Sequence, residues 1–183
     1  LRSAQPTRRR PGRNGITPTA TTKNTGVMPR PMLGKSETDA VCGALQRSLT
    51  DMIDLALLLK QAHWNVTGSS FKSIHEQLDE IIDDVRDGAD EIAERLAQLG
   101  VAPDGRSQTV AKESNLARYP DGFVDSSETV TAVSDAMATA IEGLRKSRGE
   151  VEDPDPVTED LLIAIIGPLE KHLWMMQARE AKA

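Results

Sequence analysis

The sequence predicts an all-α protein in which four long helices form one bundle. Four segments of the chain carry apolar residues at helical spacing, and residues that favour turns separate these segments. The 183 residues suit a single domain, and 38% apolar but only 3% aromatic residues indicate a core of Leu, Ile, Val and Ala. This composition favours packed helices over a β-sandwich.

Residues 1–36 differ from the rest of the chain in their charge. They hold eight of the 22 basic residues and none of the 28 acidic ones. The segment is rich in Pro, Gly, Thr and Asn, so it cannot offset the entropy of ordering, and we predict a disordered tail followed by a domain over 37–183. A mobile cationic arm can bind DNA phosphates without sequence preference, although a transit peptide or an inert tail would have a similar composition. The residues predicted to contact DNA are Arg8, Arg9, Arg10, Arg13, Lys23, Arg30 and Lys35.

Two long helices are predicted in the first half of the domain. The first covers about residues 37–66, where Ser36 and Asp39 have the spacing of an N-terminal cap and Gly68 ends the apolar pattern. The second covers about residues 71–99 and buries one apolar side before Gly100.

A long crossover connects this pair to a third helix. Residues 101–122 are rich in Gly, Pro and Ser, and the segment is long enough to hold a short helix near residues 109–113. Asp125 followed by Glu128 begins the third long helix, which ends near Gly149.

The fourth long helix begins at Asp155 and Pro156 and ends near Ala178. Gly167 and Pro168 interrupt its pattern, and because proline removes a helical hydrogen bond, we expect a kink there. Two helix pairs joined by one long crossover form a ferritin-like bundle.

Residues that can bind metal recur along the first two predicted helices. His75 and Asp79 form one pair at spacing i,i+4, and Asp90 and Glu94 form another, so each pair projects from one helix face; His63 lies nearby in sequence. Asp90 follows Asp79 by eleven positions, which places the pairs on one stripe but about 16 Å apart. One ion cannot bridge that distance. An antiparallel second copy would bring opposite pairs together, so the sequence predicts a metal site shared by two chains.

Other function classes find little support in the sequence. Cys42 is the only cysteine, which excludes a disulfide within the chain and favours a reducing compartment such as the cytoplasm. No run approaches the roughly 18 apolar residues of a membrane span, so we expect no contact with a membrane. Glycine-rich phosphate loops and a Gly-x-Ser-x-Gly nucleophile motif are also absent. Import into an organelle stays open because of the composition of the tail.

The candidate ligands lie within a longer run of characteristic residues. This run reads His63-Trp64-Asn65-Val66-x-Gly68-x-x-Phe71-x-x-x-His75-x-x-x-Asp79-Glu80 and is followed by Asp90-x-x-Ala93-Glu94-Arg95. It resembles the signature of the Dps family, the DNA-binding proteins from starved cells, which are miniferritins. The resemblance covers about residues 37–180 and is reinforced by Thr158-x-Asp160-Leu161-Leu162 and Glu170-Lys171-x-x-Trp174.

The resemblance implies a hollow shell of twelve subunits with ferroxidase centres on its inner face. His63, His75 and Asp79 would come from one subunit, and Asp90 and Glu94 from its two-fold mate. The centres would oxidise Fe(II), usually with hydrogen peroxide, and the shell would store ferric mineral and protect DNA from oxidative damage.

Further residues take roles from the same resemblance. It places Trp64 beside the iron site, where its ring would shield the centre and intercept radicals; a core aromatic is the alternative. It places an acidic cluster at three-fold pores that concentrate Fe²⁺, although acidic residues are also common at any helix N-terminus. The pore residues would be Glu152, Asp153, Asp155 and Asp160.

Histidine and acidic residues outside the metal pattern are expected to be structural or solvated. We expect a structural role for His172, packing for Trp174, and a solvated or cavity-lining face for Asp83, Asp84 and Asp87.

Two other functions remain to be weighed. The shell could act chiefly as a multivalent platform for basic arms that compact the nucleoid. A conventional ferritin or other di-iron oxidase would instead need Glu-x-x-His motifs, which this sequence lacks.

Overall fold

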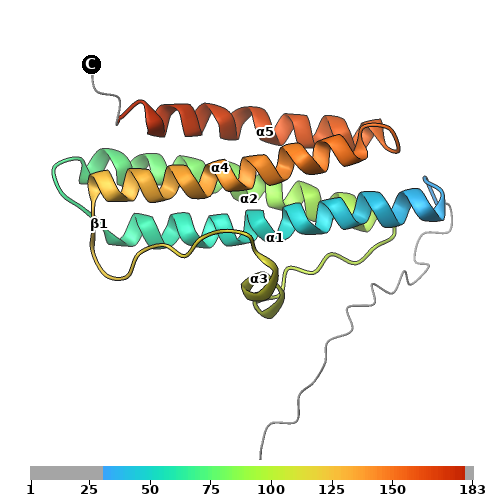
Figure 1. Ribbon diagram of the computed structural model, residues 1–183, viewed down its shortest axis with the longest axis horizontal. Helices are drawn as coiled ribbons and strands as arrows, with labels where there is room; N and C mark the ends of the chain where they lie inside the picture. Colours follow the sequence, from blue (N-terminus) through green and yellow to red (C-terminus); the bar gives the residue numbers. More distant parts are fainter. Residues whose placement is uncertain (1–30, 180–183) are drawn as a thin grey trace, which may run out of the picture.

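The computed structural model describes residues 31–179, which form an all-α, ferritin-like fold. Four long helices lie side by side along the length of the molecule, and a short helix stands beside them in the crossover (Figure 1). In chain order the elements are α1 (Lys35–Asn65), β1 (Val66–Thr67), α2 (Phe71–Gln98), α3 (Ser107–Glu113), β2 (Val124–Asp125), α4 (Ser126–Val151) and α5 (Pro156–Gln177).

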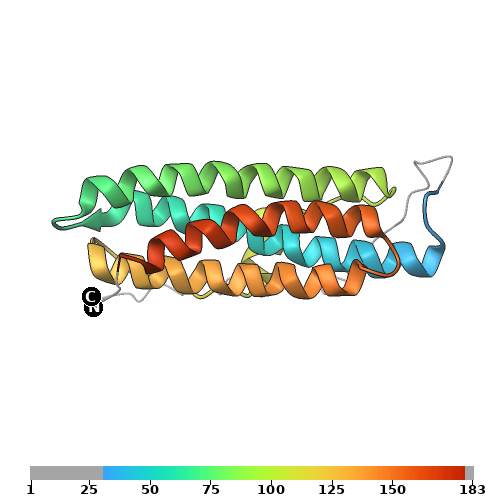
Figure 2. The same ribbon diagram turned by 90° about the horizontal axis from the view of Figure 1, so that it is seen from above.

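The helices form two antiparallel pairs, α1 with α2 and α4 with α5. The crossover runs back along the bundle and carries α3 against α1, so that α4 begins at the end where α2 also begins (Figures 1 and 2). All four long helices and the short one agree with the predicted segments to within about two residues. Within residues 31–179, no helix is long and apolar enough to cross a lipid bilayer.

Three local features differ from the sequence-based expectations. Gly34 rather than Ser36 is the N-cap of α1, because the Glu37 carboxylate accepts a hydrogen bond from the Gly34 N–H at 2.9 Å. The helix α5 runs unbroken through Pro168, although its ribbon changes direction along its length (Figure 2). Strands β1 and β2, which periodicity did not predict, pair in parallel and join the α1–α2 turn to the start of α4.

The predicted tail lies mostly outside the described residues. The candidate DNA contacts Arg8, Arg9, Arg10, Arg13, Lys23 and Arg30 fall in the part of the chain that the structure does not describe. Lys35 is the first residue of α1, is exposed, and lies 3.1 Å from the Asp39 carboxylate.

The core between the four long helices is aliphatic, as the composition predicted. Every apolar residue expected on the inner side of α2 is buried, and each buried Leu or Ile contributes about 1.5–3 kcal/mol. Of the five Phe, Trp and Tyr residues, only Tyr119 belongs to the core, where its hydroxyl lies 2.9 Å from Thr129 Oγ1. The largest fully buried side chains are Leu45, Met52, Leu55, Leu59, Ile74, Leu78, Ile81, Ile82, Ile92, Leu96, Met137 and Leu144.

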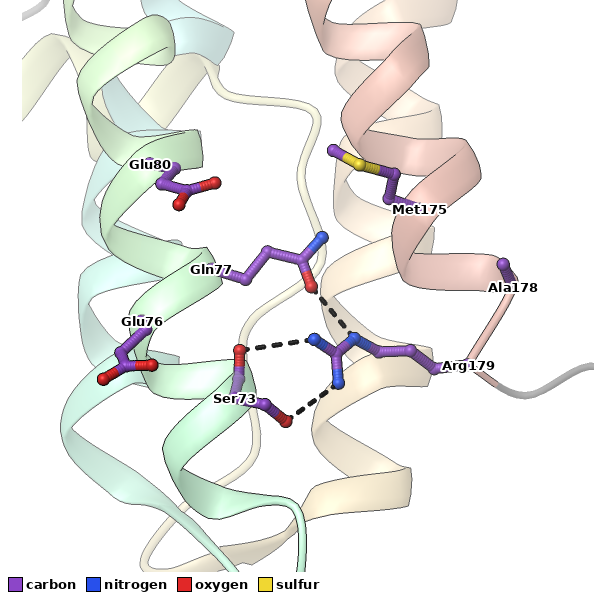
Figure 3. A pocket seen from close by; sticks show the side chains of 7 residues that line it. All are labelled: Ser73, Glu76, Gln77, Glu80, Met175, Ala178 and Arg179. Carbon is purple, nitrogen blue, oxygen red and sulfur yellow. Dashed lines mark hydrogen bonds between the residues drawn. The ribbon is translucent and has the colours of Figure 1, made fainter.

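Polar contacts fix the crossover and the end of α5. The buried Asp51 carboxylate accepts hydrogen bonds from the backbone and side-chain amides of Asn115, which holds the crossover against α1. At the far end of the chain, Arg179 donates to Gln77 Oε1 at 2.9 Å and to Ser73 Oγ at 3.0 Å across an open groove of about 540 Å³ (Figure 3). These bonds tie the end of α5 to the first turns of α2.

The helix α2 packs closely against its neighbours at Gly88. A Cβ atom there would lie 3.0 Å from Ile165 Cγ2 and 3.1 Å from Met52 Cε, whereas a Cβ atom at Gly149 of α4 would meet nothing within 4 Å. We predict that Gly88→Val overpacks the core and lowers the free energy of unfolding by about 1–3 kcal/mol. The matched control Gly149→Ala should raise it by about 0.5–1 kcal/mol, because alanine costs less backbone entropy in a helix.

Chemical denaturation of both variants, followed by circular dichroism, tests this pair. Equal effects of the two substitutions would contradict the close packing at Gly88.

Candidate metal centre

The α1–α2 turn brings the candidate ligands of two helices together. His63 lies in the last turn of α1, and His75 and Asp79 lie in the first turns of α2. Gly68 permits the reversal between them, because its φ of 103° is in the left-handed region and a Cβ atom would lie 2.9 Å from the Asp125 carboxylate. The turn therefore sets the first three predicted ligands side by side.

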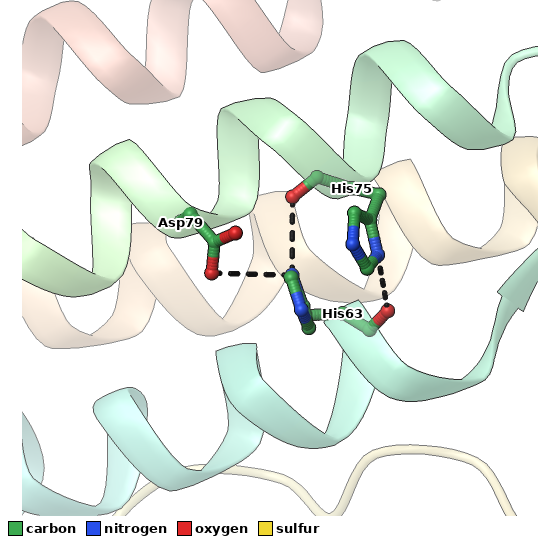
Figure 4. Close-up of side chains that lie close together, drawn as sticks. All are labelled: His63, His75 and Asp79. Carbon is green, nitrogen blue, oxygen red and sulfur yellow. Dashed lines mark hydrogen bonds and ion pairs between the residues drawn. The ribbon is translucent and has the colours of Figure 1, made fainter.

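These three side chains form a compact cluster, shown in Figure 4. One ligand atom from each of His63, His75 and Asp79 lies within 4.8 Å of the others. The two imidazole rings stack, with centroids 3.6 Å apart and planes inclined by 22°. Among the described residues, this is the only group of three or more such side chains close enough to hold one ion.

The hydrogen bonds of the two histidines determine which ring nitrogen can bind metal. His63 Nδ1 lies 3.1 Å from the His75 carbonyl oxygen, and His75 Nδ1 lies 2.9 Å from the His63 carbonyl oxygen. Because a carbonyl oxygen can only accept, each Nδ1 must carry the proton and donate it. The lone pair of a neutral ring is then on Nε2, which is the arrangement of a metal-binding histidine held by a second hydrogen bond.

The electrostatics of the cluster keep the histidine neutral and the carboxylate charged. His63 is buried, and burial lowers its pKa below the usual value, although hydrogen bonding to His75 and the charge of Asp79 oppose this shift. A hydrogen bond from Lys60 lowers the pKa of Asp79. At neutral pH the cluster therefore offers the neutral imidazole of His63 and the charged carboxylate of Asp79.

Lys60 was not expected from the sequence. Its ammonium group lies 2.7 Å from Asp79 Oδ1, and the same carboxylate oxygen lies 3.3 Å from His63 Nδ1. Lys60 precedes His63 by three residues on α1, so helical spacing places it on the same face. A positive charge at the carboxylate competes with any cation that the cluster binds.

Asp90 and Glu94 lie apart from this cluster. Both are exposed, and they lie on α2 closer to its C-terminal end, outside the group that the structure brings together. In the single chain Asp90 and Glu94 therefore do not join His63, His75 and Asp79.

Exposed apolar side chains lie on the same two helices as the cluster. Trp64 is 64% exposed and Leu57, two turns earlier on α1, is 58% exposed, while the Phe71 ring lies 5.1 Å from the ring of His75. The alternative that Trp64 is a core aromatic is therefore wrong for the single chain. We expected Trp174 to pack against other side chains, but it is 65% exposed in the single chain.

The predicted pore residues divide into exposed and buried groups. Glu152, Asp153 and Asp160 are exposed, and Glu152 lies 3.0 Å from Arg148. Asp155 is instead 4% exposed and bonded to Arg95, so its carboxylate cannot line a pore. This corrects the prediction for Asp155, which the family resemblance grouped with the other acids.

His172 and Asp84 form a pair between α5 and α2. The buried ring of His172 places Nε2 2.7 Å from Asp84 Oδ2, at a distance in sequence from the ligand cluster. This contact agrees with a structural role for His172, and it shows that Asp84 has a partner on α5 rather than solvent alone.

The bundle topology and the ligand cluster together define the class of protein. Antiparallel helix pairs joined by one long crossover, with histidine and carboxylate side chains gathered on facing helices, are the properties of ferritin-like proteins. A family model described as a ferritin-like domain matches residues 42–182.

Individual relatives narrow this class. The DNA protection during starvation protein of Mycolicibacterium smegmatis is 40% identical over 152 residues, which cover 81% of each chain. The fine tangled pili major subunit of Haemophilus ducreyi is 41% identical over 138 residues, covering 75% of this chain and 73% of that protein. The tetragonal form of Mycobacterium smegmatis Dps superposes with a TM-score of 0.81 at 37% identity, covering 84% of this chain and 93% of that one. The chain belongs to the Dps family of miniferritins.

Lys60 allows a direct test of the cluster as a cation site. We predict that Lys60→Met raises the affinity for Co²⁺, a redox-stable substitute for Fe²⁺, about three- to tenfold at pH 7, because a competing charge is removed. The pKa of Asp79 should rise in this variant, so protons should displace Co²⁺ at a higher pH than in the wild type.

Calorimetric titration with Co²⁺ over a series of pH values measures both effects. Lys72→Met is the matched control, because Lys72 lies on the first turn of α2 but pairs with Glu76 at 3.6 Å. A weaker affinity in Lys60→Met would show that Lys60 orients Asp79 and does not compete with the ion.

Proposed function

We propose that this protein oxidises Fe(II) at centres shared by two subunits and stores the ferric product inside a shell of twelve identical subunits. The observation that carries the proposal is the half-complete ligand cluster of His63, His75 and Asp79 at an exposed apolar surface. The relatives named for DNA protection during starvation support a protective role, and their bacterial origin supports a cytoplasmic location.

The ligand set suits iron in both oxidation states. Imidazole and carboxylate groups together bind Fe(II), and carboxylates stabilise Fe(III) as it forms. Asp90 and Glu94 carry like charges at spacing i,i+4, so they repel each other unless a cation lies between them. In the proposed centre these two residues of the two-fold mate complete the coordination of the iron.

The oxidant in this proposal is hydrogen peroxide. Each of two Fe(II) ions gives up one electron, and the peroxide takes up both electrons and two protons and is reduced to two molecules of water. Because the two electrons are transferred together, hydroxyl radical does not form. The ferric ions then hydrolyse to oxyhydroxide within the shell.

The exposed apolar surface around the cluster supports completion of the site by a second copy. Leu57 and Trp64 of α1 are each more than half exposed in the single chain, and Trp64 directly follows the ligand His63. A neighbouring subunit that covers them excludes water from the iron and strengthens its ligand bonds. In that position the Trp64 ring shields the centre and intercepts radicals.

Acidic residues at the α4–α5 turn supply the route for iron in this proposal. Glu152, Asp153 and Asp160 are exposed, and three copies around a three-fold axis would form a negative pore that concentrates Fe²⁺.

Subunit mixing tests whether the centre is shared. His75→Ala and Asp90→Ala should each abolish rapid oxidation of Fe²⁺ by stoichiometric peroxide. When the two variants are unfolded, mixed in equal amounts and reassembled, each mixed dimer contains one intact site, so about a quarter of all sites should recover. The rate of Fe²⁺ oxidation measures this recovery.

Each variant reassembled alone is the control for this mixture. A centre held within one chain would predict no recovery at all, because every chain carries one inactivating substitution.

A second function, binding of DNA through the basic tail, is favoured by its charge and by the names of the relatives. Residues 1–36 carry a net charge of +8, whereas residues 37–183 carry −14, and weak arms on one shell would bind together with high avidity. We predict that removal of residues 1–36 abolishes retardation of DNA in gels and leaves the rate of iron oxidation unchanged.

The salt dependence of DNA binding tests whether the tail binds through its positive charge. Binding by the full chain should weaken steeply as salt rises, because each phosphate contact releases a counterion. DNA binding that survives the truncation would locate the contact elsewhere in the shell.

A further inference from the structure

Three aspartates in the described part of the chain directly precede a glycine. An Asp-Gly sequence can rearrange spontaneously, because glycine has no side chain that hinders the approach of its amide nitrogen to the aspartyl carboxyl group. All three sequences share this intrinsic reactivity, so a difference between them in the folded protein must come from their surroundings. The pairs are Asp87 with Gly88, Asp104 with Gly105 and Asp121 with Gly122.

The rearrangement proceeds through a cyclic imide. The glycine nitrogen attacks the aspartyl Cγ, a C–N bond forms and the Cγ–OH bond breaks, so the hydroxyl leaves with the amide proton as water. One water molecule then opens the ring. When this water adds to the former main-chain carbonyl, the product is isoaspartate, which has one more carbon in the backbone and a free α-carboxylate. The reaction needs no oxidant, and the protonated carboxyl group is the reactive form.

The helix α2 protects the first of these sites. Gly88 lies in the interior of α2, where its N–H belongs to the helical hydrogen-bond ladder. A neighbouring helix also packs closely on it, since a Cβ atom at Gly88 would lie 3.0 Å from Ile165 Cγ2. Ring closure at Asp87 therefore requires local unfolding of the helix, and the small population of the unfolded form limits its rate.

Hydrogen bonds restrain the carboxylate of the second site. Asp104 Oδ1 accepts from the backbone N–H of Arg106 at 3.1 Å and from its Nε at 2.9 Å, and Oδ2 accepts from Thr109 Oγ1 at 2.9 Å. The backbone N–H and carbonyl oxygen of Asp104 are both bonded to the Gln46 side chain. Hydrogen bonds from Arg106 hold the pKa of Asp104 well below its usual value, so the reactive protonated form is rare.

Neither kind of restraint acts at the third site. Asp121 and Gly122 form a bend at the end of the crossover, and the Gly122 N–H donates no hydrogen bond to any described residue. Gly122 has a φ of 79°, and a Cβ atom there would meet nothing within 4 Å. The Asp121 carboxylate pairs with Arg118, but both side chains are 83% exposed, so solvent screens this pair and allows it to open.

We propose that Asp121 and Gly122 form a modification site at which the folded protein converts aspartate to isoaspartate, whereas the other two Asp-Gly sequences stay intact. The product presents a free α-carboxylate on an exposed loop, which is the group that an S-adenosylmethionine-dependent isoaspartyl methyltransferase esterifies. The added backbone carbon lies shortly before Val124, whose pairing with Val66 joins the crossover to the α1–α2 turn. This inference does not depend on iron oxidation.

Peptide mapping of the full-length, assembled protein after prolonged incubation at mildly acidic pH tests the site. Trypsin separates the three Asp-Gly sequences into peptides 87–95, 96–106 and 119–145, and it places Asn14 and Gly15, which lie outside the described residues, in a fourth. Electron-transfer fragmentation locates isoaspartate in each peptide, and transfer of labelled methyl groups by the methyltransferase counts it independently. We expect isoaspartate at Asp121 to exceed that at Asp87 and at Asp104 at least about tenfold.

Three controls separate the effect of the fold from that of the sequence. In guanidinium chloride the three sites should react at rates within about threefold of each other, because the restraints of the folded state are removed. Asp121→Glu keeps the charge but requires a larger ring, so peptide 119–145 should contain no isoaspartate. Arg106→Gln removes the main hydrogen bonds to Asp104 and should raise isoaspartate there at least about fivefold.

Four results would overturn the inference. Equal amounts at the three sites of the folded protein show that the sequence alone sets the reactivity. An intact Asp121 after a time in which the denatured sample has reacted shows that the assembled protein restrains this loop. Isoaspartate that persists in peptide 119–145 of Asp121→Glu places the reaction at another residue. An unchanged Asp104 in Arg106→Gln shows that its hydrogen bonds do not protect it.

Discussion

The site depends on one interaction, the reciprocal hydrogen bonds between His63 and His75. Each Nδ1–H donates to the carbonyl oxygen of the other residue, so the last turn of α1 and the first turn of α2 are fixed face to face. The same bonds set the tautomer of both rings and leave the Nε2 lone pair available to a metal. The same two hydrogen bonds therefore fix the packing of α1 against α2 and orient the histidine rings. A change in the helix packing also changes the orientation of the rings.

Much of this arrangement can be predicted from local patterns. The bounds of α2 follow from its apolar period and from Gly100, whose φ of 84° allows the helix to end there. Two short features are not predictable in this way. The strands β1 and β2 are two residues each and pair Val66 with Val124, so no periodicity reports them. The cap at Gly34 depends on the Glu37 side chain, whose carboxylate folds back and accepts a hydrogen bond from the Gly34 N–H.

The acidic turn shows where sequence spacing fails. Asp155 has the same local context as Asp153 and Glu152, since all three precede a helix where acids are favoured. Its burial is decided by Arg95, sixty residues earlier in the chain, which only the packing of α2 against α5 brings within reach. Lys60 was not predicted for a simpler reason. A pattern of metal-ligating residue types contains no lysine, so it does not indicate a lysine that pairs with a carboxylate ligand.

A centre divided between chains makes iron binding and assembly depend on each other. In the single chain the cluster of His63, His75 and Asp79 offers three candidate ligands, and Leu57 and Trp64 of the same helix α1 stay in contact with water. In the proposed centre, a second subunit buries that apolar surface and adds two carboxylates, which alone would repel each other. An ion that binds only the assembled form must stabilise assembly by the same free energy that assembly adds to binding. In the proposed shell, iron is therefore both the substrate and an ion that stabilises the contact between the two subunits that bind it.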